Sequence, residues 1–302
     1  MSRIHEALKK AEQERAAAQG MGLDSPAGGA GADTHFAAVS TGETDMPAAA
    51  APAFSQQLTV DALLTRSQSA NWHPDPQTML FFGAQDNAPG MEEFRTLRSR
   101  LYQLREKMPL KKLLVSSPLP REGKSFVAAN LAQVLVKQHG RRVLLIDGDL
   151  RGPKLHRVLG ASEGPGLSDY LTGEVDEFTV MQRGSMDNLF FLSAGKRVSS
   201  PAELVANGRL KFLMNRVSAL FDWIVVDSPP AVTVSDASLL ANFCDGVLLV
   251  VRSTMTPCDT ARRARMEFGD KQLLGVVLNG VEAGASTYSH YYYSYGQEES
   301  RQ

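Results

Sequence analysis

The sequence predicts an α/β fold, in which a mostly parallel central sheet is flanked by helices on both faces. Three short apolar runs, 143–146, 223–226 and 247–251, lie next to Gly or Asp residues. Runs of this length are typical of strands buried on both faces, and they are too short to cross a membrane. Segments with helical periodicity alternate with these runs, which favours βαβ units and places ligands at the carboxyl ends of the strands.

The predicted elements follow one another from residue 92 onward. The first segment, 92–107, repeats apolar residues every three or four positions, which predicts an amphipathic helix. A tight loop with Gly-Lys-Ser separates the next strand from its helix, and Gly140 ends that helix. The full prediction is helices at 92–107, 124–138, 201–220, 236–243 and 257–268, and strands at 112–117, 142–147, 189–192, 223–227, 246–251 and 275–279.

Outside this region the composition changes. Residues 1–19 predict a short N-terminal helix, for which a frayed and solvated terminus is the alternative. Residues 20–56 are rich in Gly, Ala and Pro and poor in large apolar residues, so we expect a disordered linker. Residues 57–90 are then a connecting segment, 91–284 the α/β domain, and 285–302 a flexible tail. Five of the seven tyrosines of the chain lie in that tail.

The composition excludes several classes of protein. The chain has 302 residues and a formal net charge of −1, which argues against a surface built to bind nucleic acid. Its cysteines, Cys244 and Cys258, exclude a disulfide scaffold and fit a reducing compartment. The first residues contain no apolar core of a signal peptide, so we expect a soluble, cytoplasmic protein.

The segment 112–125 reads as a strand, a loop, Gly-Lys-Ser and the start of a helix. That context suits a phosphate-binding loop, because backbone N–H groups at a helix N-terminus converge on phosphate oxygens. Lys124 would reach the β- and γ-phosphates, and the Ser125 hydroxyl would help to hold Mg²⁺. Pro118 replaces the first glycine of the general pattern, so for this segment alone a structural turn remains the alternative.

Three aspartates strengthen the nucleotide interpretation. Asp147 and Asp149 follow one buried strand, and Asp227 follows another. Burying carboxylates at strand ends is costly without a cation. Mg²⁺ bridging to nucleotide phosphates would supply one, since it prefers hard oxygen ligands. We therefore expect ATP and Mg²⁺ as cofactors.

With these residues identified, the sequence resembles the bacterial tyrosine kinases (BY-kinases) of capsule and exopolysaccharide loci, which are P-loop NTPases of the MinD/ParA-like branch. Segment 116–125 matches the family's Walker A motif, 144–151 its Walker A′ motif and 224–230 its Walker B motif. The helix 92–98 matches the family's Glu-x-x-Arg-x-x-Arg motif, and the tail resembles its C-terminal tyrosine cluster. The resemblance covers the chain from about residue 91.

The resemblance implies a role for each matching residue. The residues expected against the nucleotide are Arg121, Glu122, Gly123, Lys124, Ser125, Phe126 and Arg151. The expected catalytic residues are Lys124, Asp147, Asp149 and Asp227, with Asp147 as the base for the incoming tyrosine hydroxyl. The expected metal ligands are Ser125, Asp149 and Asp227. The expected autophosphorylation sites are Tyr288, Tyr291, Tyr292, Tyr293 and Tyr295, and the expected self-association residues are Glu92, Arg95 and Arg98.

The implied function is an ATP-dependent tyrosine autokinase that phosphorylates its own tail in trans and regulates exopolysaccharide or capsule polymerisation and export. The implied partners are further copies in a ring, a separate membrane adaptor of the polysaccharide co-polymerase type and a cognate tyrosine phosphatase. We expect the protein at the inner face of the cell membrane, held there by its adaptor.

Other functions stay open from the sequence. A MinD/ParA-type ATPase or a nitrogenase-iron-protein-like reductase would typically carry a lysine early in the loop, where this chain has Leu119. A degenerate nucleotide-binding regulator is suggested by Arg121, which stands where the BY-kinases usually carry Gly. Pro118 and Pro120 also stiffen the loop. These departures predict either weaker nucleotide binding or an additional cationic contact to phosphate.

Overall fold

The computed structural model describes residues 59–83, 88–271 and 273–281. The chain divides into two units, Met1–Phe54 and Ser55–Gln302, and all described residues belong to the second. The predicted N-terminal helix, the whole predicted linker and the tyrosine tail lie outside the described residues. The fold below is therefore that of the α/β domain and of most of the segment that precedes it.

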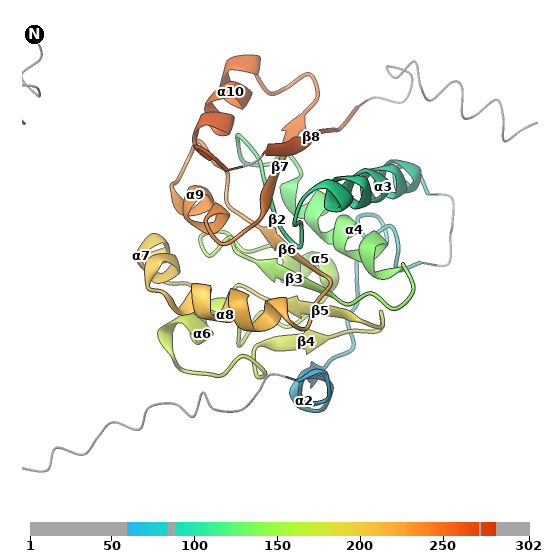
Figure 1. Cartoon of the computed structure of the whole chain (residues 1–302), viewed down its shortest axis with the longest axis vertical. Coiled ribbons are helices and arrows are strands. Elements are labelled where there is room, and N and C mark those ends of the chain that lie inside the picture. Colours follow the sequence, from blue (N-terminus) through green and yellow to red (C-terminus); the bar gives the residue numbers. More distant parts are fainter. Residues whose placement is uncertain (1–58, 84–87, 272, 282–302) are drawn as a thin grey trace, which may run out of the picture. The chain divides into compact units, whose positions relative to one another are not determined.

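The centre of this domain is an eight-stranded sheet with the order β1-β4-β5-β3-β6-β2-β7-β8. All neighbouring strands are parallel except β4 and β5, which are antiparallel. The predicted α/β class and the mostly parallel sheet are thereby confirmed (Figure 1). The strands are β1 (Gln68–Ser69), β2 (Lys112–Ser116), β3 (Val143–Asp147), β4 (Met181–Arg183), β5 (Leu189–Leu192), β6 (Trp223–Asp227), β7 (Gly246–Arg252) and β8 (Leu273–Asn279).

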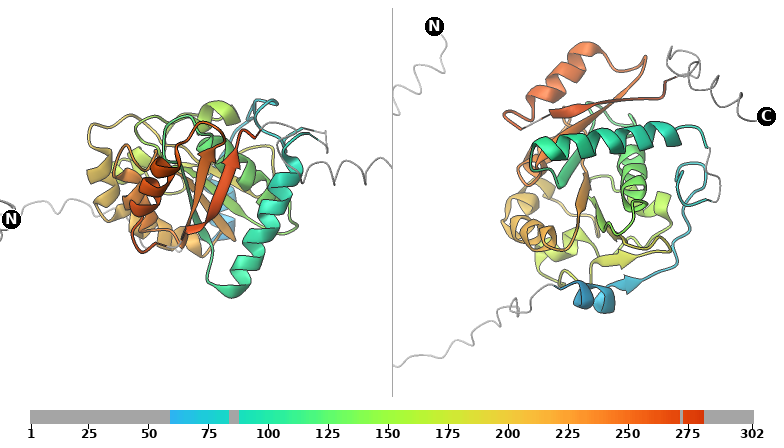
Figure 2. Two further views of the ribbon diagram at one scale, coloured as in Figure 1. Left: turned by 90° about the horizontal axis from the view of Figure 1, so that it is seen from above. Right: turned by 45° about the vertical axis from the view of Figure 1, so that its right-hand side comes forward.

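Helices cover both faces of the sheet, and Figure 2 shows α3 and α10 on opposite sides of it. One face packs against α3 (Met91–Lys107), α4 (Lys124–Val136) and α5 (Leu155–Leu159). Helix α4 is apolar on almost every side because it lies between α3 and the central strands. The other face packs against α2 (Val60–Arg66), α6 (Leu167–Thr172), α7 (Pro201–Ala206), α8 (Arg209–Ser218), α9 (Asp236–Ala241) and α10 (Cys258–Met266).

The predicted single helix at 201–220 is wrong, because the structure has two helices there. Gly208 separates α7 from α8 with a left-handed backbone, φ +84°, and serves as the N-cap of α8. A glycine adopts this conformation without steric cost, so it ends one helix and starts the next. The prediction assigned no element to five segments that form α2, β1, α5, α6 and β4, each of which is short.

The described part of the predicted connecting segment, residues 59–83 and 88–90, contains regular secondary structure and buried side chains. Helix α2 packs Leu63 into one core, β1 extends the sheet beside β4, and Trp72, Met79 and Phe81 are buried in the other core. This segment therefore passes from one face of the sheet to the other around its edge. No helix among the described residues combines the length and the apolar character needed to cross a bilayer.

Candidate active site

The three strands that carry the predicted site are neighbours in the sheet. Strand β6 lies between β3 and β2, and Asp147 stands opposite Asp227 in the register of β3 and β6. Between the two aspartates of the β3 loop, the Gly148 N–H donates to the Asp227 carbonyl at 2.8 Å. A Cβ on Gly148 would lie 2.8 Å from that oxygen, so only glycine allows this approach. The structure thus brings the strand-end aspartates together beside the loop after β2.

The loop between β2 and α4 is held in shape by its own side chains. The Glu122 carboxylate accepts the Leu119 N–H at 2.7 Å and also the Thr256 hydroxyl. Gly123 has φ +94°, and a Cβ there would lie 2.0 Å from the Asn279 amide nitrogen. Arg121 also has a left-handed backbone, φ +66°, which is rare for a residue with a side chain. The loop therefore stores strain directly before the first turn of α4.

Lys124, the first residue of α4, is the cation among the carboxylates. Its ammonium donates to Asp149 at 3.0 Å, lies 3.8 Å from an Asp227 oxygen and donates to the Ser125 hydroxyl at 3.4 Å. Burial disfavours its charge, but Asp227 and Asp149 outweigh that effect and raise the pKa of Lys124 above its ordinary value. The lysine is therefore charged and held at the end of the sheet.

Asp147 is fully buried and is held by backbone N–H groups. One oxygen accepts from Asp149 N at 3.2 Å, and the other accepts from Lys154 N at 3.2 Å and Leu155 N at 3.1 Å. Burial, followed by the nearby Asp227 carboxylate, raises the pKa of Asp147 to about 7, although the Leu155 N–H lowers it. A carboxylate with a pKa near neutrality is suited to accept and release a proton.

Asp227 has the opposite arrangement, because neither of its buried carboxylate oxygens has a hydrogen-bond partner among the described residues. Burial raises the pKa of Asp227 to about 6, against the Lys124 ammonium and the Ser125 hydroxyl, which lower it. A buried carboxylate that accepts no hydrogen bond from the described residues, beside a hydroxyl and a second carboxylate, fits Mg²⁺, which binds hard oxygen ligands and keeps several waters. In the described part of the chain no three His, Cys, Asp or Glu residues form a metal site by themselves. That Ser125, Asp149 and Asp227 hold the ion together with phosphate and water stays a prediction.

Two of the predicted nucleotide-binding residues are already engaged within the fold. The Arg151 guanidinium binds both oxygens of Asp236, at 2.7 and 3.0 Å. The Phe126 ring packs edge-on against Phe94, with 5.8 Å between centroids. Arg151 thus ties the loop after β3 to the first turn of α9, and Phe126 ties the start of α4 to α3. Their roles toward a nucleotide stay predictions.

The residues predicted for self-association lie on α3. Arg95 forms an ion pair with Glu92 one turn away. Arg98 donates to the Val134 carbonyl near the end of α4, at 3.1 Å. Arg98 therefore contributes to the packing of α3 on α4, whatever further role it has.

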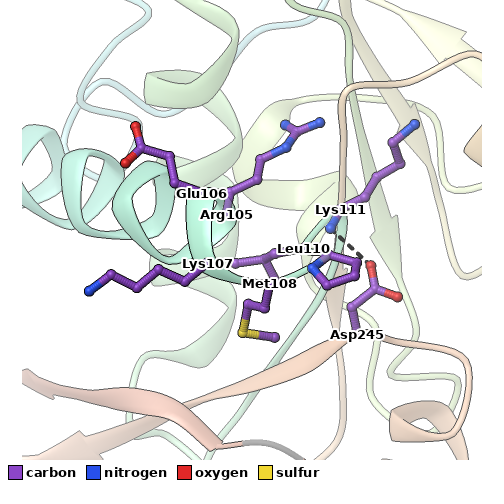
Figure 3. Close-up of a pocket in the computed structure, with 8 residues that line it drawn as sticks. Arg105, Glu106, Lys107, Met108, Leu110, Lys111 and Asp245 are labelled. Atoms are coloured by element: carbon purple, nitrogen blue, oxygen red, sulfur yellow. Dashed lines mark hydrogen bonds between the residues drawn. The ribbon is translucent and has the colours of Figure 1, made fainter.

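A hollow of about 520 Å³ lies at the other edge of the sheet, where β2 and β7 begin (Figure 3). Its lining includes Arg105, Lys111 and Asp245. The Asp245 carboxylate accepts the N–H groups of Lys111 and Lys112 at 2.9 and 2.7 Å. The Lys111 ammonium donates to the Ser218 carbonyl at 2.7 Å. The hollow lies at the opposite ends of the strands from Lys124, Asp147 and Asp227, so it is not the site of the predicted chemistry.

Reasoning from the sequence missed three residues of the site region. Asp236 holds Arg151, Thr256 donates to Glu122, and Asn279 donates to the Glu122 carbonyl at 2.9 Å. Asn279 ends β8 as Asp147 and Asp227 end their strands, so extending the strand-end argument to uncharged polar residues would have found it. Asp236 and Thr256 carry no comparable signal.

Comparisons with known proteins agree with this geometry. A profile of the ParA family, described as NUBPL iron-transfer P-loop NTPase, matches residues 111–302. The tyrosine-protein kinase YwqD of Bacillus subtilis is 34% identical over 211 residues, which are 69% of this chain and 87% of the relative. The tyrosine-protein kinase wzc of Salmonella typhimurium is 32% identical over 209 residues, 68% of this chain and 29% of that relative.

A solved structure gives the same result. The kinase domain of the Escherichia coli tyrosine kinase ETK is similar with a TM-score of 0.62 and 28% identity, over 73% of this chain and 91% of that one. The chain spans most of the Bacillus relative but less than a third of several longer relatives. The strand-end aspartates, the loop before Lys124 and these similarities agree: the chain belongs to the bacterial tyrosine-protein kinases, within the ParA-type P-loop NTPases.

Proposed function

We propose that this protein transfers the γ-phosphoryl group of ATP to tyrosines of its own C-terminal tail. The observation that carries the proposal is the buried cluster of Asp147, Asp149 and Asp227 around Lys124, at the end of a strained phosphate-binding loop. Such a cluster is expensive to maintain in the interior of a protein unless it serves chemistry. Family membership supports the same reaction.

Each group has a task in this reaction. Lys124 and the backbone N–H groups at the start of α4 bind and orient the phosphates. Asp147, whose pKa is raised to about 7, accepts the proton of the tyrosine hydroxyl. Ser125, Asp149 and Asp227 would hold Mg²⁺, which when bound neutralises charge on the phosphates. Phosphoryl transfer asks mainly for positioning and charge stabilisation, and these residues supply both.

The position of the end of β8 supports the use of the tail as substrate. Strand β8 ends at Asn279, whose side chain contacts the phosphate-binding loop through the Glu122 carbonyl. Strand β8 therefore ends at the edge of the sheet that carries the site. We infer that the tail tyrosines, Tyr288, Tyr291, Tyr292, Tyr293 and Tyr295, enter the site of a neighbouring copy.

We infer that several copies associate in a ring through Glu92, Arg95 and Arg98. Each phosphate adds about −1.5 to −2 charges at neutral pH, so a multiply phosphorylated tail repels itself and weakens docking. Phosphorylation would then disassemble the ring, and a cognate phosphatase would restore it. A separate membrane adaptor of the co-polymerase type would hold the protein at the inner face of the membrane, where it regulates exopolysaccharide or capsule export.

The test is a phosphotyrosine map of the full chain incubated with Mg-ATP, read by mass spectrometry. We expect phosphate on the tail tyrosines of the wild-type chain and none on the Lys124→Met variant. ATP binding without any phosphotyrosine would instead favour a nucleotide-binding regulator. ATP hydrolysis without phosphotyrosine would favour a MinD/ParA-type ATPase. Gel filtration before and after phosphorylation tests the ring, because an unchanged oligomer would contradict the disassembly step.

A further inference from the structure

A strap, defined here as residues 72–81, crosses the sheet face that carries α4 and α5. It has no regular secondary structure, yet Trp72, Met79 and Phe81 are each 5% exposed or less. The Trp72 ring packs edge-on against Phe191 of β5, with 6.1 Å between centroids. The buried backbone N–H and C=O groups of such an irregular segment need hydrogen-bond partners, and residues of α4 and α5 provide them.

The strap binds α4 through two fully buried amide side chains. Asn130 accepts the Leu80 N–H at 2.9 Å and donates to the Thr78 carbonyl at 2.8 Å. Gln133 accepts the Phe81 N–H at 3.1 Å. Polar side chains in the middle of an otherwise apolar helix are unfavourable unless they are satisfied in this way. They therefore fix the strap to the same helix that begins with Lys124 and Ser125.

The strap binds α5 through its backbone. His73 N donates to the Gly160 carbonyl at 3.3 Å, and Asp75 N donates to the Val158 carbonyl at 3.1 Å. The two chains approach so closely that a Cβ on Gly160 would lie 2.2 Å from the His73 carbonyl oxygen. Helix α5 matters for chemistry because the N–H groups of Lys154 and Leu155, at its start, hold the Asp147 carboxylate.

We propose that the strap is a positioning element of the active site. By joining α4 to α5 it sets the phosphate-binding residues Lys124 and Ser125, at the start of α4, against the base Asp147, whose carboxylate the start of α5 holds. Asn130 and Gly160 are the positioning residues on its two sides. The expected effect on the phosphorylation rate rests on the proposed kinase function. The expected effect of the strap on the position of α5 does not depend on that function. An offset of about 1 Å between reacting groups costs on the order of 100-fold in rate, so a modest shift of the strap is measurable.

The first test is Gly160→Ala, which forces the strap away from α5 without changing the strap or any catalytic residue. Gly269→Ala is the matched control, because Gly269 has φ +55° against +60° for Gly160 and has no atom within 4 Å of its would-be Cβ. Both variants carry the same backbone strain of about 1 kcal/mol, and only one displaces the strap.

For Gly160→Ala we expect kcat for tyrosine phosphorylation to fall at least about fivefold while the Kd for ATP changes less than about twofold. Hydrogen exchange at the Lys154 and Leu155 amides should accelerate in Gly160→Ala and not in Gly269→Ala. Equal rates and equal exchange in the two variants would overturn the proposal. If the wild-type chain transfers no phosphate, the proposed function fails, and the exchange measurement still decides on the strap.

The second test is Asn130→Ala, which cuts the strap from α4. Here we expect the Kd for ATP to rise about threefold or more, because the start of α4 loses its support. Asn207→Ala is the control, since Asn207 also joins backbone groups but on the other face of the sheet. A lower melting temperature of Asn130→Ala with unchanged Kd and unchanged kcat would mean that the strap only stabilises the fold, and this result would contradict the proposal.

Discussion

The two edges of the central sheet handle buried charge in opposite ways. Where β2 and β7 begin, the Asp245 carboxylate accepts two backbone N–H groups and lies 3.5 Å from the Lys112 ammonium. Where β6 ends, Asp227 is more deeply buried and neither oxygen has a hydrogen-bond partner among the described residues. The same residue type accepts backbone hydrogen bonds at one edge, while at the other it lies 3.8 Å from the Lys124 ammonium and accepts no hydrogen bond from the described residues. The hydrogen-bonded carboxylate serves the fold, and the carboxylate without hydrogen bonds serves the chemistry.

The largest contrast between the edges is expected from their lysines. Lys124→Met removes the cation at the site and should reduce tail phosphorylation by about 10³-fold or more. Lys111→Met removes a lysine of the opposite edge, whose ammonium donates to the Ser218 carbonyl, and should leave the rate within about threefold. Initial rates of phosphotyrosine formation measure both. Comparable losses in the two variants would contradict the assignment of the site to the carboxyl ends of the strands.

The next largest effect is expected at Asp147. Asp147→Asn removes the proposed base and should lower kcat by about 10²-fold or more. Asp222 directly precedes β6 at the opposite edge, where its carboxylate accepts the Arg142 N–H at 3.0 Å, and Asp222→Asn should have little effect on kcat. Because the base must be ionised and its pKa is raised to about 7, the wild-type rate should increase as pH rises through 7. The Asp147→Asn variant should lose this increase. A pH profile of kcat that stays the same in Asp147→Asn would exclude Asp147 as the base.

The carboxylates predict stability changes of opposite sign. The pKa of Asp227 is about 6 in the fold against 3.8 ordinarily, so its stabilising contribution is full below pH 4 and is lost as pH rises through 6. Asp227→Asn should therefore raise the free energy of unfolding at pH 8 by about 1–2 kcal/mol, with no gain near pH 4. Asp245→Asn should lower it by about 0.5–1 kcal/mol.

Urea unfolding of the nucleotide-free chain at the two pH values measures these changes. A loss of stability in Asp227→Asn at pH 8 would contradict this contrast, because the Lys124 ammonium and the Ser125 hydroxyl would then stabilise the ionised carboxylate more than burial destabilises it.

The smallest effect concerns backbone strain. Arg121 in the phosphate-binding loop and Asn188 at the opposite edge both have left-handed backbones, at φ +66° and +63°. Asparagine tolerates this conformation better than arginine, so Arg121→Gly should stabilise the protein by about 0.5 kcal/mol and Asn188→Gly by less. Chemical denaturation resolves the difference between the two variants. An equal gain would mean that the loop holds no extra strain.

The fold class and the site motifs were predictable from the sequence because their signals are local. The runs that form β3, β6 and β7 carry their strand character in a few residues, and Asp147 and Asp227 directly follow them. The topology then brings these strand ends together, as parallel strands require. The local sequence around each strand was therefore enough to predict that Asp147 and Asp227 lie close together.

The remaining features depend on contacts between distant segments. The strap is bound by Asn130, 50 residues from its partner Leu80, and no periodicity marks residues 72–81. The pairing of Arg151 with Asp236 joins residues 85 positions apart. The break at Gly208 was missed because one glycine within a helical pattern is often tolerated, and only its left-handed backbone shows that α7 ends there.

The central claim is that one copy phosphorylates the tail of another with the site around Lys124. The most direct measurement mixes two variants with Mg-ATP: Lys124→Met, which keeps the tail but lacks the site, and a chain whose five tail tyrosines are changed to phenylalanine, which keeps the site but lacks the substrate. We expect phosphotyrosine on the tail of the Lys124→Met chain in the mixture, and in neither variant alone. A mixture that binds ATP and forms no phosphotyrosine, or a Lys124→Met chain that becomes phosphorylated alone, would contradict it.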